Sequence, residues 1–465
     1  MPTLPTLRKN ACPIVLTGRA CSPAAEAFVQ RLLDNVIVPN RAASGRHKQA
    51  GDATQLKLRT ATTALLAALM NLARSSRQSD GPLAGAHGMS RSHFQSRKLG
   101  FGYDIFIEVT GTLEAEGLLV RRVGYPRWGA PKGQKQGATT CFQMTDGMLA
   151  LADAFGVSTD NWEDHWTLRP EFGSDQVDKR LELRARRKSQ RGQKQPAVDL
   201  PVDLSDPGAA ELDAQIARIN RFLLSQDIDG LSFHGLRRIF NNGDQPDFAW
   251  NKGGRFYSAP GGQAYERWNA DLRQRVITID GKRVVEVDLK ASHLTLLHAL
   301  AGQPFNPTND PVYDPYKTED FPRLVVKLWV AQALGSSNPR PFQWSKKSQA
   351  DYEQDRPGQW LQDAFPISEV GAVVKHKHPL LIELRFLRFS TLDLQYHEAE
   401  ILRRAMEKLI FPHGIPVLPI HDALIVPHTL AAEAERCLKD AFKEYVEGVT
   451  GIECQVVPDV TLKEG

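Results

Sequence analysis

The spacing of apolar residues predicts three helices followed by two strands in the first third of the chain. Three segments have helical periodicity, residues 54–74, 89–98 and 103–116. Gly117 is placed to end the third helix, because glycine readily adopts the left-handed conformation that often follows a helix. Residues 118–123 and 139–144 are each predicted to form a strand. The segment that connects them is rich in Gly, Lys and Arg.

This order resembles a winged helix-turn-helix, in which one helix enters the major groove of DNA and a basic wing meets phosphates. The predicted DNA-binding cations are Arg121, Arg122, Arg127, Lys132 and Lys135. The alternative is a small domain that docks on its neighbour while its basic loop stays solvated. We predict a mainly helical, winged-helix-like domain over residues 51–170, preceded by residues 1–50, which have no clear pattern.

Cations and prolines, rather than apolar periodicity, mark the next segment. Residues 184–194 carry many Lys and Arg, and residues 195–209 contain three prolines. This composition predicts a flexible basic linker over residues 171–208, followed by a second domain over residues 209–465. The linker is either a solvated spacer or an arm whose binding to phosphates falls steeply with salt.

Two apolar strands in the second domain each run into an aspartate. An Asp280-Gly281 turn signal precedes the strand that ends at Asp288, and Asp422 sits at the turn of a later hairpin. Two carboxylates held side by side repel each other, and a divalent cation removes that repulsion. Two-metal phosphoryl transfer needs such a pair to hold the attacking and leaving oxygens. We therefore predict that Asp288 and Asp422 are catalytic and bind Mg²⁺ or Mn²⁺.

Helices and cations surround these two strands. Helical patterns begin near Leu212, Ala291, Leu394 and Leu430, and residues 454–457 suggest a last strand. Arg323 and Lys327 are four residues apart, so on a helix they share a face that suits a triphosphate. The alternative is two solvated surface cations. The order strand–helix, strand–turn–strand, helix, strand resembles that of a polymerase palm.

Residues 250–465 resemble the palm and reduced fingers of family A DNA polymerases, so the expected fold class is α+β. The strand ending in Asp288 is similar to the family's motif A, and His421-Asp422 is similar to its motif C. Arg323 and Lys327 match the spacing of motif B. The resemblance implies a DNA template and primer and nucleoside triphosphates as partners, with a replicative helicase or small accessory protein as a further one.

The resemblance also implies roles for residues around the aspartates. Gly254-Arg255 is similar to a dipeptide that contacts the primer terminus, and Gln395 is similar to a glutamine on the helix before motif C. Both are expected to position primer or template, and His421 to support the hairpin and the primer strand. His293 stands where the family has the glutamate that screens out ribose, so strict deoxynucleotide use is not implied.

Other departures favour a diverged enzyme. Ala423 replaces the glutamate that usually ends motif C, and Ala331 and Gly335 replace aromatic residues. A complete 3′–5′ exonuclease domain has no room. These features resemble the family-A-like enzymes of phages and mobile elements, some of which are primases. The choice between primase and primer-extending polymerase stays open, as do two further classes: a non-catalytic replication initiator with a decayed palm, and a nuclease.

Bulk composition excludes other classes. The net charge of +4 by itself says little about nucleic acid. The chain is 42% hydrophobic and 24% charged, which indicates a globular protein, and its 465 residues suggest roughly three domains. Its five cysteines are scattered without a CxxC pair, so neither a disulfide framework nor a zinc ribbon is indicated, and a reducing cytoplasm is expected. No apolar run approaches the ~18 residues of a membrane span.

Overall fold

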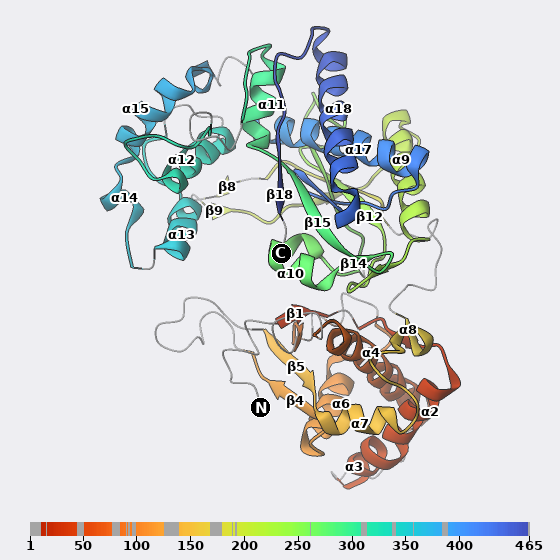
Figure 1. The fold of residues 1–465 in the computed structure, drawn as a ribbon. Coiled ribbons are helices and arrows are strands. Elements are labelled where there is room, and N and C mark those ends of the chain that lie inside the picture. Colours follow the sequence, from red (N-terminus) through yellow and green to blue (C-terminus); the bar gives the residue numbers. More distant parts are fainter. Residues whose placement is uncertain are drawn as a thin grey trace.

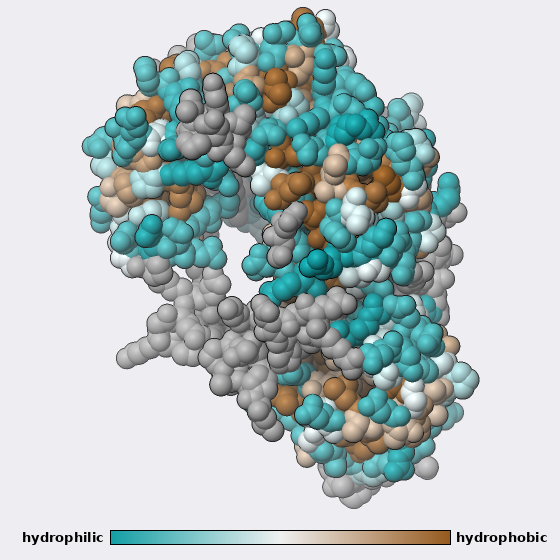
Figure 2. Space-filling view, viewed as in Figure 1, coloured by the Kyte–Doolittle hydropathy of each residue, from teal (hydrophilic) through white to brown (hydrophobic). Residues whose placement is uncertain are grey.

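The computed structural model shows a mixed α and β chain (Figure 1). It describes residues 11–463, apart from 15, 44–50, 77–83, 90, 92–93, 95–98, 125–138, 168–178, 188, 191–192, 261, 308–313, 337–340, 357 and 384–388. Figure 2 shows that hydrophilic residues cover most of one face, with hydrophobic residues in separate groups. None of the helices in this part of the chain combines the length and apolarity that crossing a bilayer requires.

The first part of the chain builds a four-stranded sheet in the order β1-β3-β5-β4. Its strands are β1 (Ala11–Pro13), β3 (Ala84–His87), β4 (Leu119–Arg122) and β5 (Thr140–Met144). The helices of this part are α2 (Pro23–Leu32), α3 (Val38–Ala43), α4 (Asp52–Ser76), α6 (Tyr103–Ala115), α7 (Asp146–Asp153) and α8 (Trp162–His165). A short pair, β2 (Arg19–Ala20) and β6 (Trp166–Thr167), completes it.

Several predictions for this part are confirmed. The helices expected at 54–74 and 103–116 are α4 and α6, and the two expected strands are β4 and β5, which pair antiparallel. Gly117 follows α6 with φ +69°. Most of the helix expected at 89–98, and the loop expected to form the wing, lie outside the described residues. Strands β1 and β3 were not expected.

The segment predicted as a flexible linker carries ordered strands, so that prediction is wrong for part of its length. β7 (Leu181–Arg184) and β10 (Asp199–Leu200) join β12 (Leu236–Phe240) and β13 (Gly253–Ser258) in the order β10-β7-β12-β13. Leu181 and Leu183 are buried and alternate with charged residues, which is the pattern of a strand with one face in the core. The same segment contains the small hairpin β8 (Ser189–Gln190) and β9 (Gln193–Lys194).

A six-stranded sheet lies at the centre of the second part. Its strands are β11 (Ile228–Asp229), β14 (Thr278–Ile279), β15 (Lys282–Leu289), β16 (Leu418–Ile420), β17 (Ala423–Pro427) and β18 (Val460–Lys463). The predicted hairpin turn is confirmed: Asp280 and Gly281 have φ +51° and +68°, as a tight two-residue turn requires. The last strand was predicted at 454–457, but Val456 forms only an isolated bridge with Phe305.

Helices cover this sheet and form a separate lobe beside it (Figure 1). Around the sheet lie α9 (Pro207–Leu223), α10 (Ala270–Val276), α11 (Ser292–Leu300), α17 (Thr391–His413) and α18 (Ala431–Thr450). The lobe contains α12 (Arg323–Ser336), α13 (Lys346–Asp355), α14 (Leu361–Ala364) and α15 (Ile367–Lys377).

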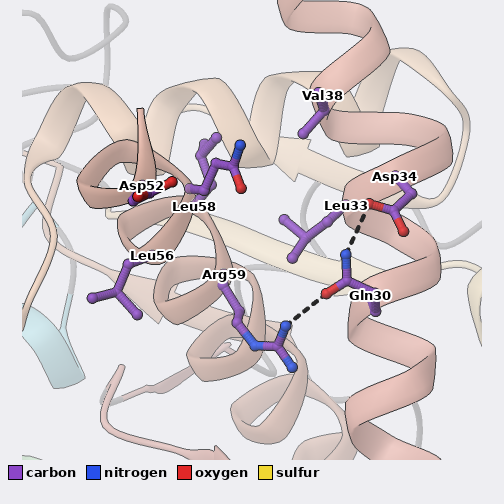
Figure 3. A pocket seen from close by; sticks show the side chains of 9 residues that line it. Gln30, Leu33, Asp34, Val38, Asp52, Leu56, Leu58 and Arg59 are labelled. Atoms are coloured by element: carbon purple, nitrogen blue, oxygen red, sulfur yellow. Dashed lines mark hydrogen bonds between the residues drawn. The ribbon is translucent and has the colours of Figure 1, made fainter. Parts of the chain in front are cut away.

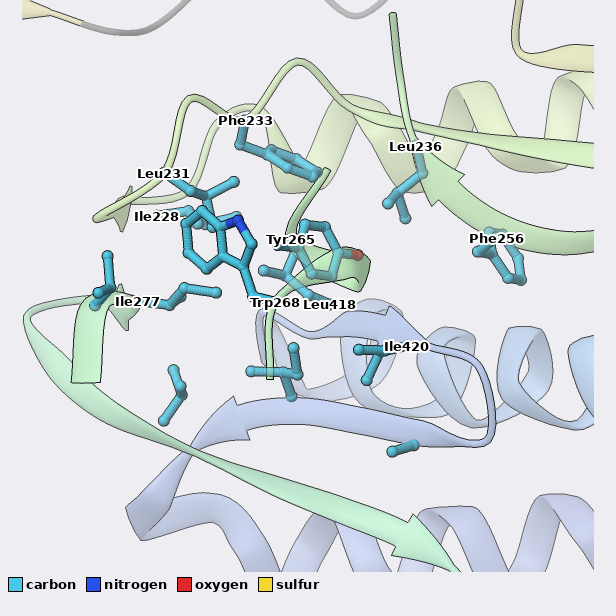
Figure 4. Packing of buried hydrophobic residues seen from close by; sticks show 14 of the residues in the cluster. Ile228, Leu231, Phe233, Leu236, Phe256, Tyr265, Trp268, Ile277, Leu418 and Ile420 are labelled. Atoms are coloured by element: carbon cyan, nitrogen blue, oxygen red, sulfur yellow. The ribbon is translucent and has the colours of Figure 1, made fainter. Parts of the chain in front are cut away.

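Large aromatic side chains join the two sheets of the second part. Tyr265 and Trp268 are buried against the β16 residues Leu418 and Ile420 (Figure 4). The Tyr265 hydroxyl donates a hydrogen bond of 2.8 Å to the Pro419 carbonyl. Because a buried phenol needs such a partner, this bond fixes the strand that leads to the turn at residue 421.

Candidate functional site

Two neighbouring antiparallel strands bring the predicted aspartates together. In the register of β15 and β17, Asp288 lies opposite Ala423, the residue after Asp422. The backbone N–H of Leu289 donates to the Asp422 carbonyl at 3.1 Å, so the pairing continues into the turn. Residues far apart in the sequence therefore present two carboxylates at the same end of the sheet.

Strained backbone follows one aspartate and precedes the other. Ala291 and His421 have φ +47° and +48°, a left-handed conformation that is uncommon for residues with a side chain. Such conformations cost about 1–3 kcal/mol each and persist where the surrounding structure determines them. Their position beside both aspartates is consistent with a site whose geometry is held by the fold.

Burial and like charge disfavour ionisation of these carboxyls. Burial, then Glu398, then Asp288 raise the pKa of Asp422 to about 8. Burial also raises the pKa of Asp288, although Lys463 and, more weakly, Lys327 act in the opposite direction. A cation placed between the two carboxylates would remove this penalty.

Two ion pairs lie at or beside the two aspartates. Lys463, on β18, donates to Asp288 Oδ2. Arg255 Nε donates to Glu398 Oε2 at 2.6 Å, and Ser292 donates to Glu398 Oε1 at 2.5 Å.

Two glycines and a helix cap place the Arg255–Glu398 pair. Gly253 and Gly254 have φ +80° and +72°, and a Cβ on Gly254 would lie 2.7 Å from Phe240. Glycine is therefore required for β13 to approach its neighbour here. Lys252 donates to Asp393 at 2.6 Å, and Asp393 forms a capping box with Ser390 at the start of α17. These contacts align β13, which carries Arg255, with α17, which carries Glu398.

Residues predicted to bind a triphosphate lie on the helical lobe. Arg323 and Lys327 share an exposed face at the start of α12, as predicted. Arg323 donates to Asp314 at 2.7 Å, and its guanidinium lies 5.2 Å from the centre of the Tyr316 ring. Burial raises the pKa of Tyr316, and the charges of Asp288 and Asp422 add to the rise. The start of this lobe therefore lies within electrostatic reach of both aspartates.

His293, Gln395 and His421 occupy positions around the same centre. His293 Nε2 lies 3.2 Å from Arg255 Nη2 and 3.6 Å from Glu398 Oε1. Burial and Arg255 lower the pKa of His421, so its imidazole is neutral near pH 7. Gln395 is half-buried on α17, one turn before Glu398. Their predicted roles toward primer and sugar stay predictions.

Of the five predicted DNA-binding cations, two lie in the described part of the chain. Arg121 Nε donates to Glu114 Oε2 at 2.8 Å, so its charge is balanced within its own domain. Arg122 is half-buried at the end of β4. Arg127, Lys132 and Lys135 lie outside the described residues.

Sequence reasoning did not assign Glu398, Lys463 or Tyr316 to this site. Glu398 lies three residues after Gln395, so a helical projection already puts it on nearly the same face. The alternation of Val460 to Lys463 is a weak strand signal, and the strand was placed too early in the chain. No local signal marks Tyr316.

The donor set suits a hard divalent cation. Carboxylate oxygens are the ligands that Mg²⁺ prefers, and Mg²⁺ is held by one or two carboxylates together with substrate phosphates. Among the described residues no group of three or more His, Cys, Asp or Glu is arranged as a metal site. Asp288 and Asp422 fit this arrangement, in which a substrate supplies the remaining ligands.

A separate hollow in the first part of the chain does not share this chemistry. It lies between α2 and α4, has a volume of about 260 Å³, and includes Gln30, Asp34 and Arg59 (Figure 3). Arg59 donates to Gln30 at 2.6 Å, and Gln30 donates to Asp34 at 2.8 Å. These polar groups hydrogen-bond to each other, so they give no sign of a ligand site.

Comparisons with known proteins find similarity among solved structures but not among family models or curated proteins. No family model matches the chain, and no curated protein matches it. Among solved structures it is similar to the POL domain of Pol1 from M. smegmatis in complex with DNA primer-template and dNTP, with 13% identity and a TM-score of 0.29. The match covers 61% of this chain and 57% of that one, less than two thirds of its length.

Proposed function

We propose that the chain is a template-dependent nucleotidyltransferase that makes nucleic acid by two-metal phosphoryl transfer. The observation that carries the proposal is the placement of Asp288 and Asp422 at one end of neighbouring strands, where burial and mutual repulsion raise the pKa of Asp422. Together with the sequence motifs, this favours a DNA primase or polymerase of a phage or mobile element, with a palm over residues 209–465 and a winged-helix-like DNA-binding domain over residues 51–170.

Each site residue has a role that follows from its surroundings. Divalent cations held by Asp288 and Asp422 would lower the pKa of an attacking 3′-hydroxyl and neutralise the leaving pyrophosphate. Lys327 and Arg323 bind the triphosphate, and Arg323 exchanges the Asp314 carboxylate for phosphate oxygens when it does so. Arg255 holds the primer end in a position fixed by Glu398.

Replacement of either aspartate tests the proposal. Asp288→Asn and Asp422→Asn are each expected to abolish nucleotide incorporation on a primed template while leaving DNA binding intact. Asp459→Asn is the matched control, because Asp459 pairs with Lys290 at 2.5 Å next to β15 and lies outside the catalytic pair. Incorporation that persists in either of the first two variants would refute the assignment.

The same assay, run on single-stranded template with rNTPs and dNTPs, with and without primer, distinguishes a primase from a primer-extending polymerase. A non-catalytic replication initiator is the second candidate, favoured by Ala423, which supplies no carboxylate, and by Lys463, which neutralises Asp288. For that candidate the wild-type protein would bind DNA without incorporating any nucleotide.

A further inference from the structure

Four carboxylates gather around the end of β15, and three of them have a cation of their own. The four are Glu286, Asp288, Glu398 and Asp422. Glu286 pairs with Arg273 at 2.6 Å, Glu398 pairs with Arg255, and Asp288 pairs with Lys463. No ion pair within the described chain reaches Asp422. A divalent cation arriving here therefore meets one unpaired carboxylate and one that already has a partner.

The three cations differ in how firmly they are enclosed. The side chains of Arg273 and Arg255 are 8% and 18% exposed, whereas that of Lys463 is 42% exposed. Arg273 also donates to the Trp268 carbonyl, which fixes it further. Lys463 is thus the cation of this cluster that can leave its carboxylate for water at the lowest cost.

The backbone of Lys463 is held by the sheet, whereas its side chain is partly exposed. β18 pairs antiparallel with β15, with Lys463 opposite Glu286 and Thr461 opposite Asp288. Gln274, on α10, donates to the Lys463 carbonyl. Figure 1 shows this end of β18 beside α10 and β15. Because residues two apart on a strand share a face, the ammonium reaches Asp288 diagonally and lies on the same face as Glu286.

We propose that Lys463 is a built-in counterion that occupies the cation position of Asp288 and is displaced when a divalent cation binds. This inference rests on the cation site of the proposed function. It assigns Lys463 as a positioning residue: it orients the Asp288 carboxylate before a cation binds, and the ion pair that must be broken opposes metal binding. Competition from Lys463 would thereby tune the affinity of the site for a divalent cation, with no change in the number of acidic ligands.

Binding of Mn²⁺ to the full chain, measured by electron paramagnetic resonance without nucleotide or nucleic acid, tests this role. Lys463→Met removes the competing ammonium but keeps an unbranched apolar side chain of similar size. We expect it to bind Mn²⁺ about fivefold more tightly than the wild type, the factor for one partly exposed ion pair that no longer has to be broken. Lys463→Arg keeps the pair and is expected to bind Mn²⁺ no more tightly than the wild type.

A lysine elsewhere supplies the control. Lys408 pairs with Glu444 at 2.8 Å and its side chain is 35% exposed, so Lys408→Met removes a similar pair away from Asp288 and should leave Mn²⁺ affinity unchanged. Equal or weaker Mn²⁺ binding by Lys463→Met, or no binding by any variant, would overturn the inference. Because no nucleotide is present, this result is independent of incorporation: an inactive protein with the expected order of affinities would refute the proposed function alone.

Discussion

Replacing Asp422 with asparagine should stabilise the fold while removing a carboxylate that the proposed reaction needs. The pKa of Asp422 rises from 3.8 to about 8 in the folded chain, chiefly through burial and then through Glu398 and Asp288. Below pH 3.8 the carboxyl is protonated in both states, so Asp and Asn are equivalent. As the pH rises toward 8, the unfolded chain has lost a proton that the folded chain retains, and wild-type stability falls.

The size of the effect follows from the width of that pH window. A shift of one unit is about 1.4 kcal/mol, so at pH 7 the upper bound is about 4 kcal/mol. Asp422 is half-buried and keeps some contact with water, which screens the charge, so we expect about half of this bound, or about 2 kcal/mol. That corresponds to a rise of roughly 4–8 °C in the unfolding midpoint of a domain of this size.

Thermal unfolding in EDTA between pH 5 and pH 9 measures this difference. The gain of Asp422→Asn should be small at pH 5 and grow until about pH 8, where the carboxyl ionises in the folded state as well. Asp459→Asn should have the opposite sign, because Lys290 holds the pKa of Asp459 below its usual value. A variant at position 422 that is no more stable than the wild type at pH 8, or a gain that does not change with pH, would refute the reasoning.

Three further substitutions test other contacts. Glu398→Gln leaves the Arg255 guanidinium without its carboxylate, and thermal unfolding should show a loss of about 3 kcal/mol; no loss would mean that the pair does not support the fold. Burial beside His378 lowers the pKa of His298 to about 4, so stability should fall as the pH drops from 6.5 to 4, and acid titration of His298→Phe should show a smaller fall. Lys327→Met should raise the KM for a nucleoside triphosphate about tenfold in steady-state incorporation assays, whereas an unchanged KM would remove Lys327 from the nucleotide site.

Local chemistry explains which elements the sequence predicts well. Residues 103–116 place Phe106, Val109 and Leu113 on one helical face, and all three are fully buried in α6. The Asp280-Gly281 turn needs two residues with positive φ, and few other dipeptides meet that need. Such signals depend on neighbours within a few positions, so they are readable without the fold.

The basic segment before α9 shows where composition misleads. Its Lys and Arg residues favour a solvated linker. In the structure, however, Leu181 and Leu183 are buried and β7 pairs with both β10 and β12. Arg180 and Arg184 then lie beside carboxylates, because Arg180 donates to Asp213 at 2.6 Å and Arg184 donates to Glu182 at 2.7 Å. A short strand takes its stability from its partners, which lie outside any local window.

One charge beside the two aspartates comes from α17, which lies outside both aspartate-bearing strand segments. Ala423 and His293 provide no acidic group beside the pair, whereas α17 brings Glu398 close enough to raise the pKa of Asp422. Arg255 pairs with Glu398 and partly offsets the repulsion between Glu398 and Asp422. In the proposed cation site, binding would therefore be weaker than with three free carboxylates, and its affinity would depend on the triphosphate and on the proposed departure of Lys463. A protein built in this way should bind divalent cations poorly alone and much more tightly with nucleotide, and equal Mn²⁺ affinity with and without nucleotide would contradict this view.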